Sequence, residues 1–167
     1  MFRKINSLYS RILLFLFLSL FFINSIPQNA SATNNNDLEK KCIDLVEKGV
    51  EHIKKVGIEQ AFKDFKDYKK NFISDELYLF TFNTKGECIQ HAINPKLVGV
   101  NLTKIQDTKG KLFIKELIDK SNSNLAGWID YYWTNPKTKK ITPKKTYYIR
   151  ENNIAGGIIL SSGFYLK

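Results

Sequence analysis

The spacing of apolar residues along the chain changes near residue 77, from a helical period to a period of two. Between Asp37 and Val56, apolar residues recur every three or four positions, which predicts an amphipathic helix that Gly57 ends. A shorter helical pattern follows over residues 58–65. The polar residues 33–36 before the long helix show no periodicity and are expected to lie outside it.

The second half of the chain alternates apolar and polar residues in short runs that turn-forming residues separate. This pattern predicts strands joined by hairpin turns, and Gly156-Gly157 in the last strand indicates a bulge. One helical segment, ending near Ser121, lies between the second and third strands. Consecutive hairpins predict an antiparallel sheet, so the fold class is α+β, with helices covering the sheet. The five predicted strands are residues 77–82, 87–91, 128–133, 141–150 and 154–165.

The first 32 residues differ in character from the rest of the chain. Basic residues precede an apolar run from Ile12 to Ile23, and Ala30-Ser31-Ala32 supplies small residues in the pattern that a signal peptidase accepts. This order predicts a secretory signal peptide cleaved after Ala32, with residues 33–167 forming one periplasmic or secreted domain. The alternative is a retained membrane anchor, although the apolar run is shorter than the roughly 20 residues of a spanning helix. No later segment approaches that length, so the mature domain is not expected to span a membrane.

Charge and cysteine content narrow the possible partners. The chain carries 26 Lys and Arg against 16 Asp and Glu, for a net charge of +10. Arg150 is the one arginine after Ala32, and nucleic-acid binders depend on arginine for bidentate contacts, so a nucleic-acid partner is not expected. Spread lysine pairs favour a solvated basic surface. Cys42 and Cys88 fit either a disulfide in an oxidising compartment or two buried free thiols, and the sequence leaves both open.

The sequence contains none of the motifs that catalysis requires. No Ser, Cys or Thr lies in a nucleophile motif with a histidine base, and no Cys or His spacing is typical of a metal site. No glycine-rich turn opens a helix to hold phosphates. The protein is therefore not expected to be an enzyme or to bind a metal or cofactor.

Aromatic residues gather on the third and fourth predicted strands. Alternation places Trp128 on one face of its strand and Tyr131 and Trp133 on the other, and Tyr147 lies on the hairpin partner. Such rings suit both core packing and the walls of a ligand pocket, and spacing alone favours core packing.

Two long runs resemble a known family. The run LYLFTFNTKGECIQHAINPKLVGVNLTKIQDTKGKLFIKELI and the later run GWIDYYWTNPKTKKITPKKTYYI are similar to the single Cache domain, second subtype, of bacterial extracytoplasmic sensors. The resemblance extends from about Cys42 to Tyr165. It implies a PAS-like fold, in which a long N-terminal helix packs on a curved five- to six-stranded antiparallel sheet that carries a pocket for small organic acids.

The resemblance also implies a set of ligand-binding residues and a function. Rings would wall the pocket, tyrosine hydroxyls would donate to ligand oxygens, and Lys144 or His91 would supply positive charge for a carboxylate. The expected function is an exported small-molecule sensor that binds a short organic acid and passes the signal to a membrane partner. The alternative is an exported protein- or surface-interaction module with the same fold and a filled pocket. The candidate ligand-binding residues are Tyr78, His91, Trp128, Tyr131, Trp133, Lys144 and Tyr147.

Overall fold

A computed structural model describes residues 29–166, and contacts within the chain delimit a unit from Thr33 to Lys167 that contains the fold. The first described helix, α2, spans Asn29–Val56 and ends before Gly57, as predicted. It begins earlier than the sequence pattern indicated. Residues 33–36 are helical because no Gly or Pro interrupts the backbone there, although these residues lack an apolar face.

Most of the predicted signal peptide lies outside the described residues, so the leader and its cleavage after Ala32 stay predictions. Within residues 29–166, none of the helices combines the length and the apolar character that crossing a membrane requires.

A short segment after α2 differs from the expected pattern. The helix α3 spans Ile58–Asp64 as predicted, and a single 3-10 turn, η1 (Tyr68–Lys70), follows it. Residues 77–82 do not form one strand. Instead β2 (Leu77–Tyr78) folds back on β1 (Ile73–Ser74) as a separate antiparallel pair. The turn that joins the two strands contains Asp75, whose φ is 56°.

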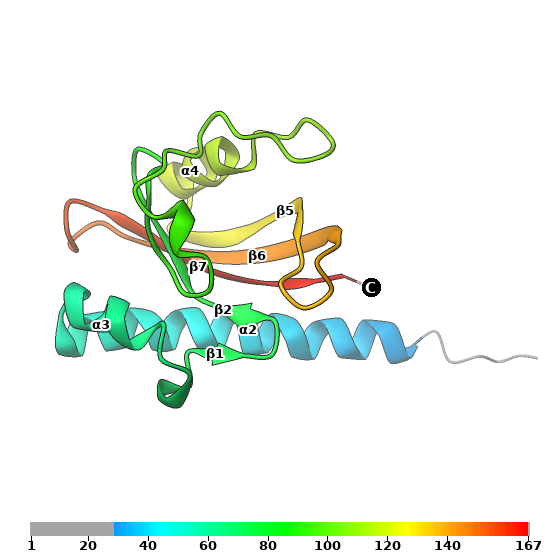
Figure 1. Ribbon diagram of the computed structural model, residues 1–167, viewed down its shortest axis with the longest axis horizontal. Coiled ribbons are helices and arrows are strands. Elements are labelled where there is room, and N and C mark those ends of the chain that lie inside the picture. The colour runs from blue at the N-terminus through cyan, green and yellow to red at the C-terminus, as the bar shows by residue number, and fades with distance from the viewer. Residues whose placement is uncertain (1–28, 167) are drawn as a thin grey trace, which may run out of the picture. The chain divides into compact units, whose positions relative to one another are not determined.

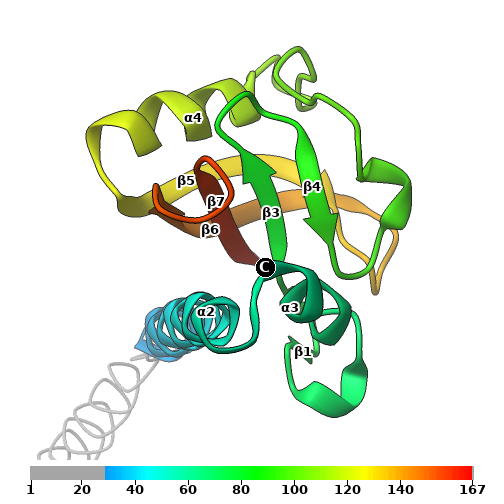
Figure 2. The same cartoon turned by 90° about the vertical axis from the view of Figure 1, so that its left-hand side faces the viewer.

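The main sheet has five strands in the order β4-β3-β7-β6-β5, and every neighbouring pair is antiparallel (Figures 1 and 2). The last strand of the chain therefore lies at the centre, where it joins the first hairpin to the second. The α+β prediction and the antiparallel sheet are confirmed. The strands are β3 (Phe80–Asn83), β4 (Cys88–His91), β5 (Ala126–Thr134), β6 (Ile141–Glu151) and β7 (Ile158–Tyr165).

The glycine pair before β7 marks a turn and not a bulge. Gly156 and Gly157 have φ values of 77° and 104°, which side-chain-bearing residues rarely adopt. The strand β7 begins only at Ile158, so the predicted strand from residue 154 was too long at its start.

The two faces of the sheet are covered by different helices, as Figure 2 shows. Helix α2 packs against one face, where Val46 and Val50 lie in the same cluster as Leu79 and Leu160. Gly49 permits this close approach, because a Cβ there would lie 2.8 Å from the side chains of both leucines. Helix α4 (Phe113–Ser123), close to the predicted helix, covers the opposite face together with the loop that contains the 3-10 turn η2 (Pro95–Leu97).

Both cysteines are buried free thiols, and they lie in the clusters on opposite faces of the sheet. Of the two alternatives, a disulfide or two buried free thiols, the structure therefore has the free thiols. Burial raises the pKa of each thiol to about 11.

Candidate functional site

The face of the sheet beneath α4 carries buried polar side chains as well as apolar ones. In β6, alternation points Lys144, Thr146 and Tyr148 into this face, and all three are buried. Tyr131 and Trp133 of the neighbouring strand β5 point the same way. Lys145 points to the α2 face, where its ammonium lies 2.7 Å from the carboxylate of Glu39.

Lys144, Tyr131 and Trp133 line a cavity between the sheet, α4 and the η2 loop. Its volume is about 20 Å³, measured as the space open to the centre of a water molecule, which is enough for about one water. A bound organic molecule would therefore need the walls to move apart. The lining residues are Tyr78, Phe80, Phe82, His91, Leu97, Leu102, Phe113, Ile114, Tyr131, Trp133 and Lys144.

Lys144 places an amine at the polar end of this cavity. The residue is 1% exposed, and its Nζ donates to the hydroxyl of Tyr78 at 2.9 Å. The same nitrogen lies 4.4 Å, 4.8 Å and 5.0 Å from the ring centroids of Tyr78, Phe80 and Tyr165. Gly163 on β7 leaves room for the lysine stem, because a Cβ there would lie 2.9 Å from its Cε. The rings therefore form a cage around the cation.

Within residues 29–166, Lys144 has no carboxylate within the 4.0 Å of an ion pair, although seven lysine–carboxylate pairs form elsewhere in this part of the chain. Burial disfavours the ammonium form and lowers the pKa of Lys144 to about 7, although the charge of Glu76 acts in the opposite direction. Buried amines of this kind are costly unless a partner compensates the charge. An anion beside Lys144 would therefore offset the cost of burying its ammonium group.

A chain of hydroxyl groups holds the amine in place. Tyr165 donates to the backbone oxygen of Thr134 at 2.9 Å, and its hydroxyl oxygen lies 3.4 Å from that of Tyr78. Because the hydroxyl proton of Tyr165 is used in the bond to Thr134, Tyr78 donates to Tyr165 and accepts from Lys144. Burial raises the pKa of Tyr78 well above its usual value and that of Tyr165 to about 12, so both phenols stay neutral at physiological pH.

His91 enters the cavity as a neutral donor. Its Nδ1 accepts a hydrogen bond from the backbone N–H of Asn94 at 3.1 Å, which leaves the proton on Nε2. Burial, assisted by the nearby charge of Lys144, lowers the pKa of His91 to about 3. The ring stacks on Phe80 at 5.7 Å between centroids. Of the two residues considered for positive charge, only Lys144 can carry it at neutral pH.

Tyr131 and Trp133 form the wall nearest α4. The Tyr131 ring stacks on Phe113 at 4.3 Å between centroids, and its hydroxyl accepts from Thr146 at 3.2 Å. The indole of Trp133 meets the edge of Phe113 at 5.3 Å. Both β5 rings therefore depend on α4 for their position.

Five of the seven predicted pocket residues come together at the cavity, and two lie elsewhere. Trp128 and Tyr147 are cross-strand partners on the α2 face, 5.0 Å apart between centroids, and Trp128 also contacts Phe164. Alternation along β5 already separated Trp128 from Tyr131, so the sequence held the signal for this correction.

The apolar wall of the cavity was not predicted as part of the site. Phe80 and Phe82 share a face with Tyr78 through the alternation of the chain, which could have identified them. Phe113 and Ile114 come from α4, and Leu97 and Leu102 come from the η2 loop and the segment after it. Only the tertiary fold brings these helix and loop residues to the strands.

Comparison with known proteins identifies the family and supports the fold. A family model described as Cache domain matches residues 21–167. A methyl-accepting chemotaxis protein from Vibrio parahaemolyticus superposes with a TM-score of 0.70 at 23% identity, over 83% of this chain and 95% of that one. Comparison with curated proteins gave no match.

Two further solved structures share the fold. One, described as the structural basis for carboxylic acid recognition by a Cache chemosensory domain, has a TM-score of 0.67 at 22% identity, over 81% of this chain and 98% of that one. A periplasmic sensor domain of a chemotaxis protein has a TM-score of 0.60 at 20% identity, over 86% of this chain and 100% of that one. With the family match over residues 21–167, these results establish that the chain belongs to the Cache domain family of extracytoplasmic, ligand-binding sensor domains.

Proposed function

We propose that this Cache domain binds a short monocarboxylic acid, with the carboxylate at Lys144. The observation that carries the proposal is the buried amine without a carboxylate partner in the described residues, at the end of a ring-lined cavity. A carboxylate there would form a charge-assisted hydrogen bond to Nζ, which is stronger than a neutral one. It would also supply the carboxylate partner that Lys144 lacks within the described residues.

The other polar groups of the cavity suit the second carboxylate oxygen. The Nε2–H of neutral His91 is a donor, and within the described chain the one hydrogen bond of this ring is made by Nδ1. A donor pair of Lys144 and His91 would hold a carboxylate without adding a second positive charge. The hydroxyl of Tyr131 lies on the same face and already accepts from Thr146, so its own proton can be donated.

The lining also limits the chemistry of the rest of the ligand. It contains no Asp or Glu that could bind an α-amino group, and Lys144 is the single cation among these residues. Amino acids and dicarboxylates would therefore leave a charged group unpaired in an apolar environment. Phe82, Leu102 and Ile114 instead favour a short hydrocarbon tail.

The likeness to the solved Cache chemosensory domain supports the same ligand class, since that structure concerns carboxylic acid recognition. We further propose that the domain works in the periplasm after cleavage of its leader at Ala32. In its loaded form it would dock on a membrane signalling partner.

Isothermal titration of the purified domain with straight-chain acids, dicarboxylates and amino acids tests this proposal. We expect heat from acids of two to four carbons only, and loss of that heat in Lys144→Met. Lys145→Met is the matched control, because it removes the same charge from the next residue on the opposite face of β6.

The titration has two outcomes that would reject the proposal. No heat and no thermal shift with any acid would favour an interaction module with a filled pocket. Equal loss of binding in both lysine variants would show that overall charge, and not the cavity amine, attracts the acid.

A further inference from the structure

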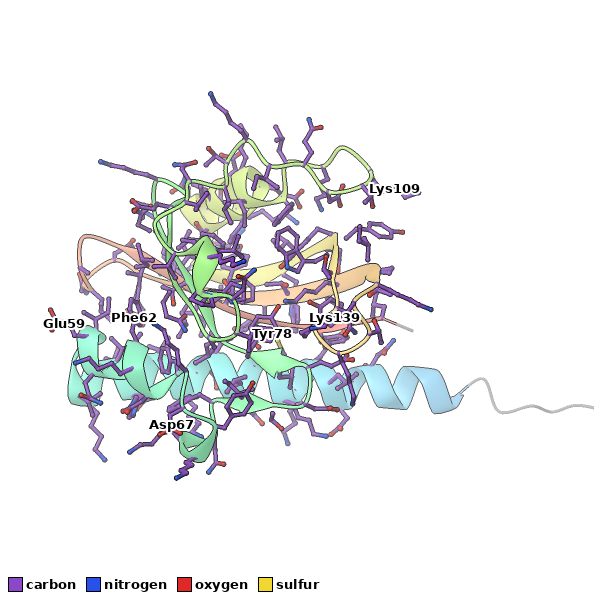
Figure 3. The ribbon with its side chains drawn as sticks, in the orientation of Figure 1. Glu59, Phe62, Asp67, Tyr78, Lys109 and Lys139 are labelled. Carbon is purple, nitrogen blue, oxygen red and sulfur yellow. The ribbon has the colours of Figure 1, made fainter. Side chains whose placement is uncertain are left out.

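A second hollow lies directly outside the cavity. This outer cleft has a volume of about 360 Å³ and is formed by the β5–β6 hairpin loop, the segment after β4, and β2. Tyr78 and Lys139, both labelled in Figure 3, belong to its walls. The complete lining of the outer cleft is Tyr78, Ile93, Asn94, Trp133, Thr134, Pro136 and Lys139.

The cavity and the outer cleft share two lining residues, Tyr78 and Trp133. These two residues therefore form a partition between the space at Lys144 and the outer cleft.

The two halves of this partition are held very differently. Tyr78 is 2% exposed and is fixed by hydrogen bonds to Lys144 and Tyr165. Trp133 is half-buried, and its indole contacts the rings of Phe113 and Tyr131 at 5.3 Å and 6.3 Å between centroids. Among the described residues, the indole N–H makes no hydrogen bond. Trp133 is therefore the part of the partition that can be changed without disturbing the amine.

We infer that Trp133 determines the specificity of the proposed acid site, because its indole closes the cavity against the outer cleft and sets the longest acid chain that fits. This inference rests on the proposed function. A tail too long for the apolar wall at Phe82, Leu102 and Ile114 would have to pass the indole to reach the outer cleft. Without the indole, the tail would continue between Ile93 and Pro136, which are apolar.

Titration of a series of straight-chain acids, from two to six carbons, tests this inference in the wild type, Trp133→Ala and Trp128→Ala. In the wild type, hexanoate should bind at least tenfold more weakly than propionate. In Trp133→Ala, affinity should instead rise with chain length, by roughly fourfold for each methylene that enters the outer cleft. Trp128→Ala is the matched control, since it removes the same side chain from the opposite face of the same strand.

The outcomes that overturn the role of Trp133 differ from the outcome that rejects the proposed function. An unchanged chain-length profile in Trp133→Ala, or the same change in Trp128→Ala, would overturn it. Hexanoate binding to the wild type as tightly as propionate would overturn it without any variant. Trp133→Leu serves if the alanine variant does not fold, as judged by circular dichroism. Failure of the wild type to bind every acid would instead reject the proposed function.

Discussion

The two faces of the five-stranded sheet bury different kinds of side chain. Under α2, Val46, Leu79 and Leu160 are fully enclosed, and the buried polar side chains of the strands there, such as Ser162, are neutral. Under α4, the buried residues include an amine, an imidazole and several hydroxyls, with Lys144 and His91 at 1% and 5% exposure. The same sheet thus carries an apolar core on one face and, on the other, ionisable groups whose burial costs free energy.

The difference supports the proposal that the α2 face stabilises the fold and the α4 face holds the ligand. Burial of apolar side chains favours folding by roughly 1.5–3 kcal/mol for each large residue. Burial of an amine without a counter-charge opposes folding. Under the proposed function, the domain has its stability from the α2 face and its binding chemistry from the α4 face.

The largest expected effect breaks the α2 face. Leu160→Ala removes a fully buried side chain that contacts the helix at Gly49, and we expect it to lower the free energy of unfolding by about 2–5 kcal/mol. Urea denaturation measures this loss. Acid affinity of the folded variant should stay within about twofold of the wild type. A loss of stability below about 1 kcal/mol would contradict the assignment of this face as the stabilising core.

The next effect has the opposite sign and concerns the α4 face. Lys144→Met keeps the volume of the side chain but removes the buried amine, so we expect it to raise the free energy of unfolding by about 2 kcal/mol at pH 7. The pKa of Lys144 falls from 10.5 to about 7 on folding, so the unfolded chain binds more protons between these values. Wild-type stability should therefore rise with pH in this window, and the gap between the two proteins should narrow. A destabilised methionine variant would contradict this account.

Acid affinity should also depend on pH through Lys144 alone. Above pH 7 the amine loses its proton, so the affinity for a carboxylate should fall by roughly tenfold per pH unit, and below pH 6 it should level off. The neighbouring groups do not titrate in this window, since the pKa of His91 is about 3 and that of Tyr165 about 12. Titration calorimetry between pH 6 and pH 9 measures the profile. A flat profile with binding intact would exclude Lys144 as the counter-charge.

The smallest effect lies outside both faces, where α2 meets α3. The carboxylate of Asp64 accepts from His52 at 2.7 Å and from Gln60 at 3.0 Å, and these contacts lower its pKa below 3.8. The stability they contribute is present above pH 3.8 and is lost as the pH falls through the lowered value. Denaturation of Asp64→Asn should therefore show a deficit at pH 7 that closes near pH 2. A deficit that persists in acid would assign it to packing instead.

Much of the fold followed from the pattern of the chain. The period of 3.6 up to Val56 and the period of two afterwards predicted α2 and the antiparallel strands, because each buries one face only. The start of α2 and the division of residues 77–82 into β2 and β3 were not predictable in this way. Both depend on backbone conformation and on pairing with β1, which leave no trace in hydrophobic periodicity.

The strand residues of the candidate site were predictable in part, and its helix and loop residues were not. Tyr78, His91, Tyr131, Trp133 and Lys144 came from the family resemblance and lie together. Residues such as Phe113 line the cavity because α4 packs on this face of the sheet, and the sequence pattern does not predict that packing. The misplaced pair, Trp128 and Tyr147, shows that strand parity must be applied before a resemblance is transferred to residues.

Nuclear magnetic resonance of the Lys144 side chain tests the central claim most directly, with Lys144→Met to assign its signal. The account predicts that the amine titrates near pH 7 in the free domain and that saturation with propionate raises its pKa above 9. An amine that titrates near 10.5 without ligand, or whose pKa does not move when acid is added, would contradict it.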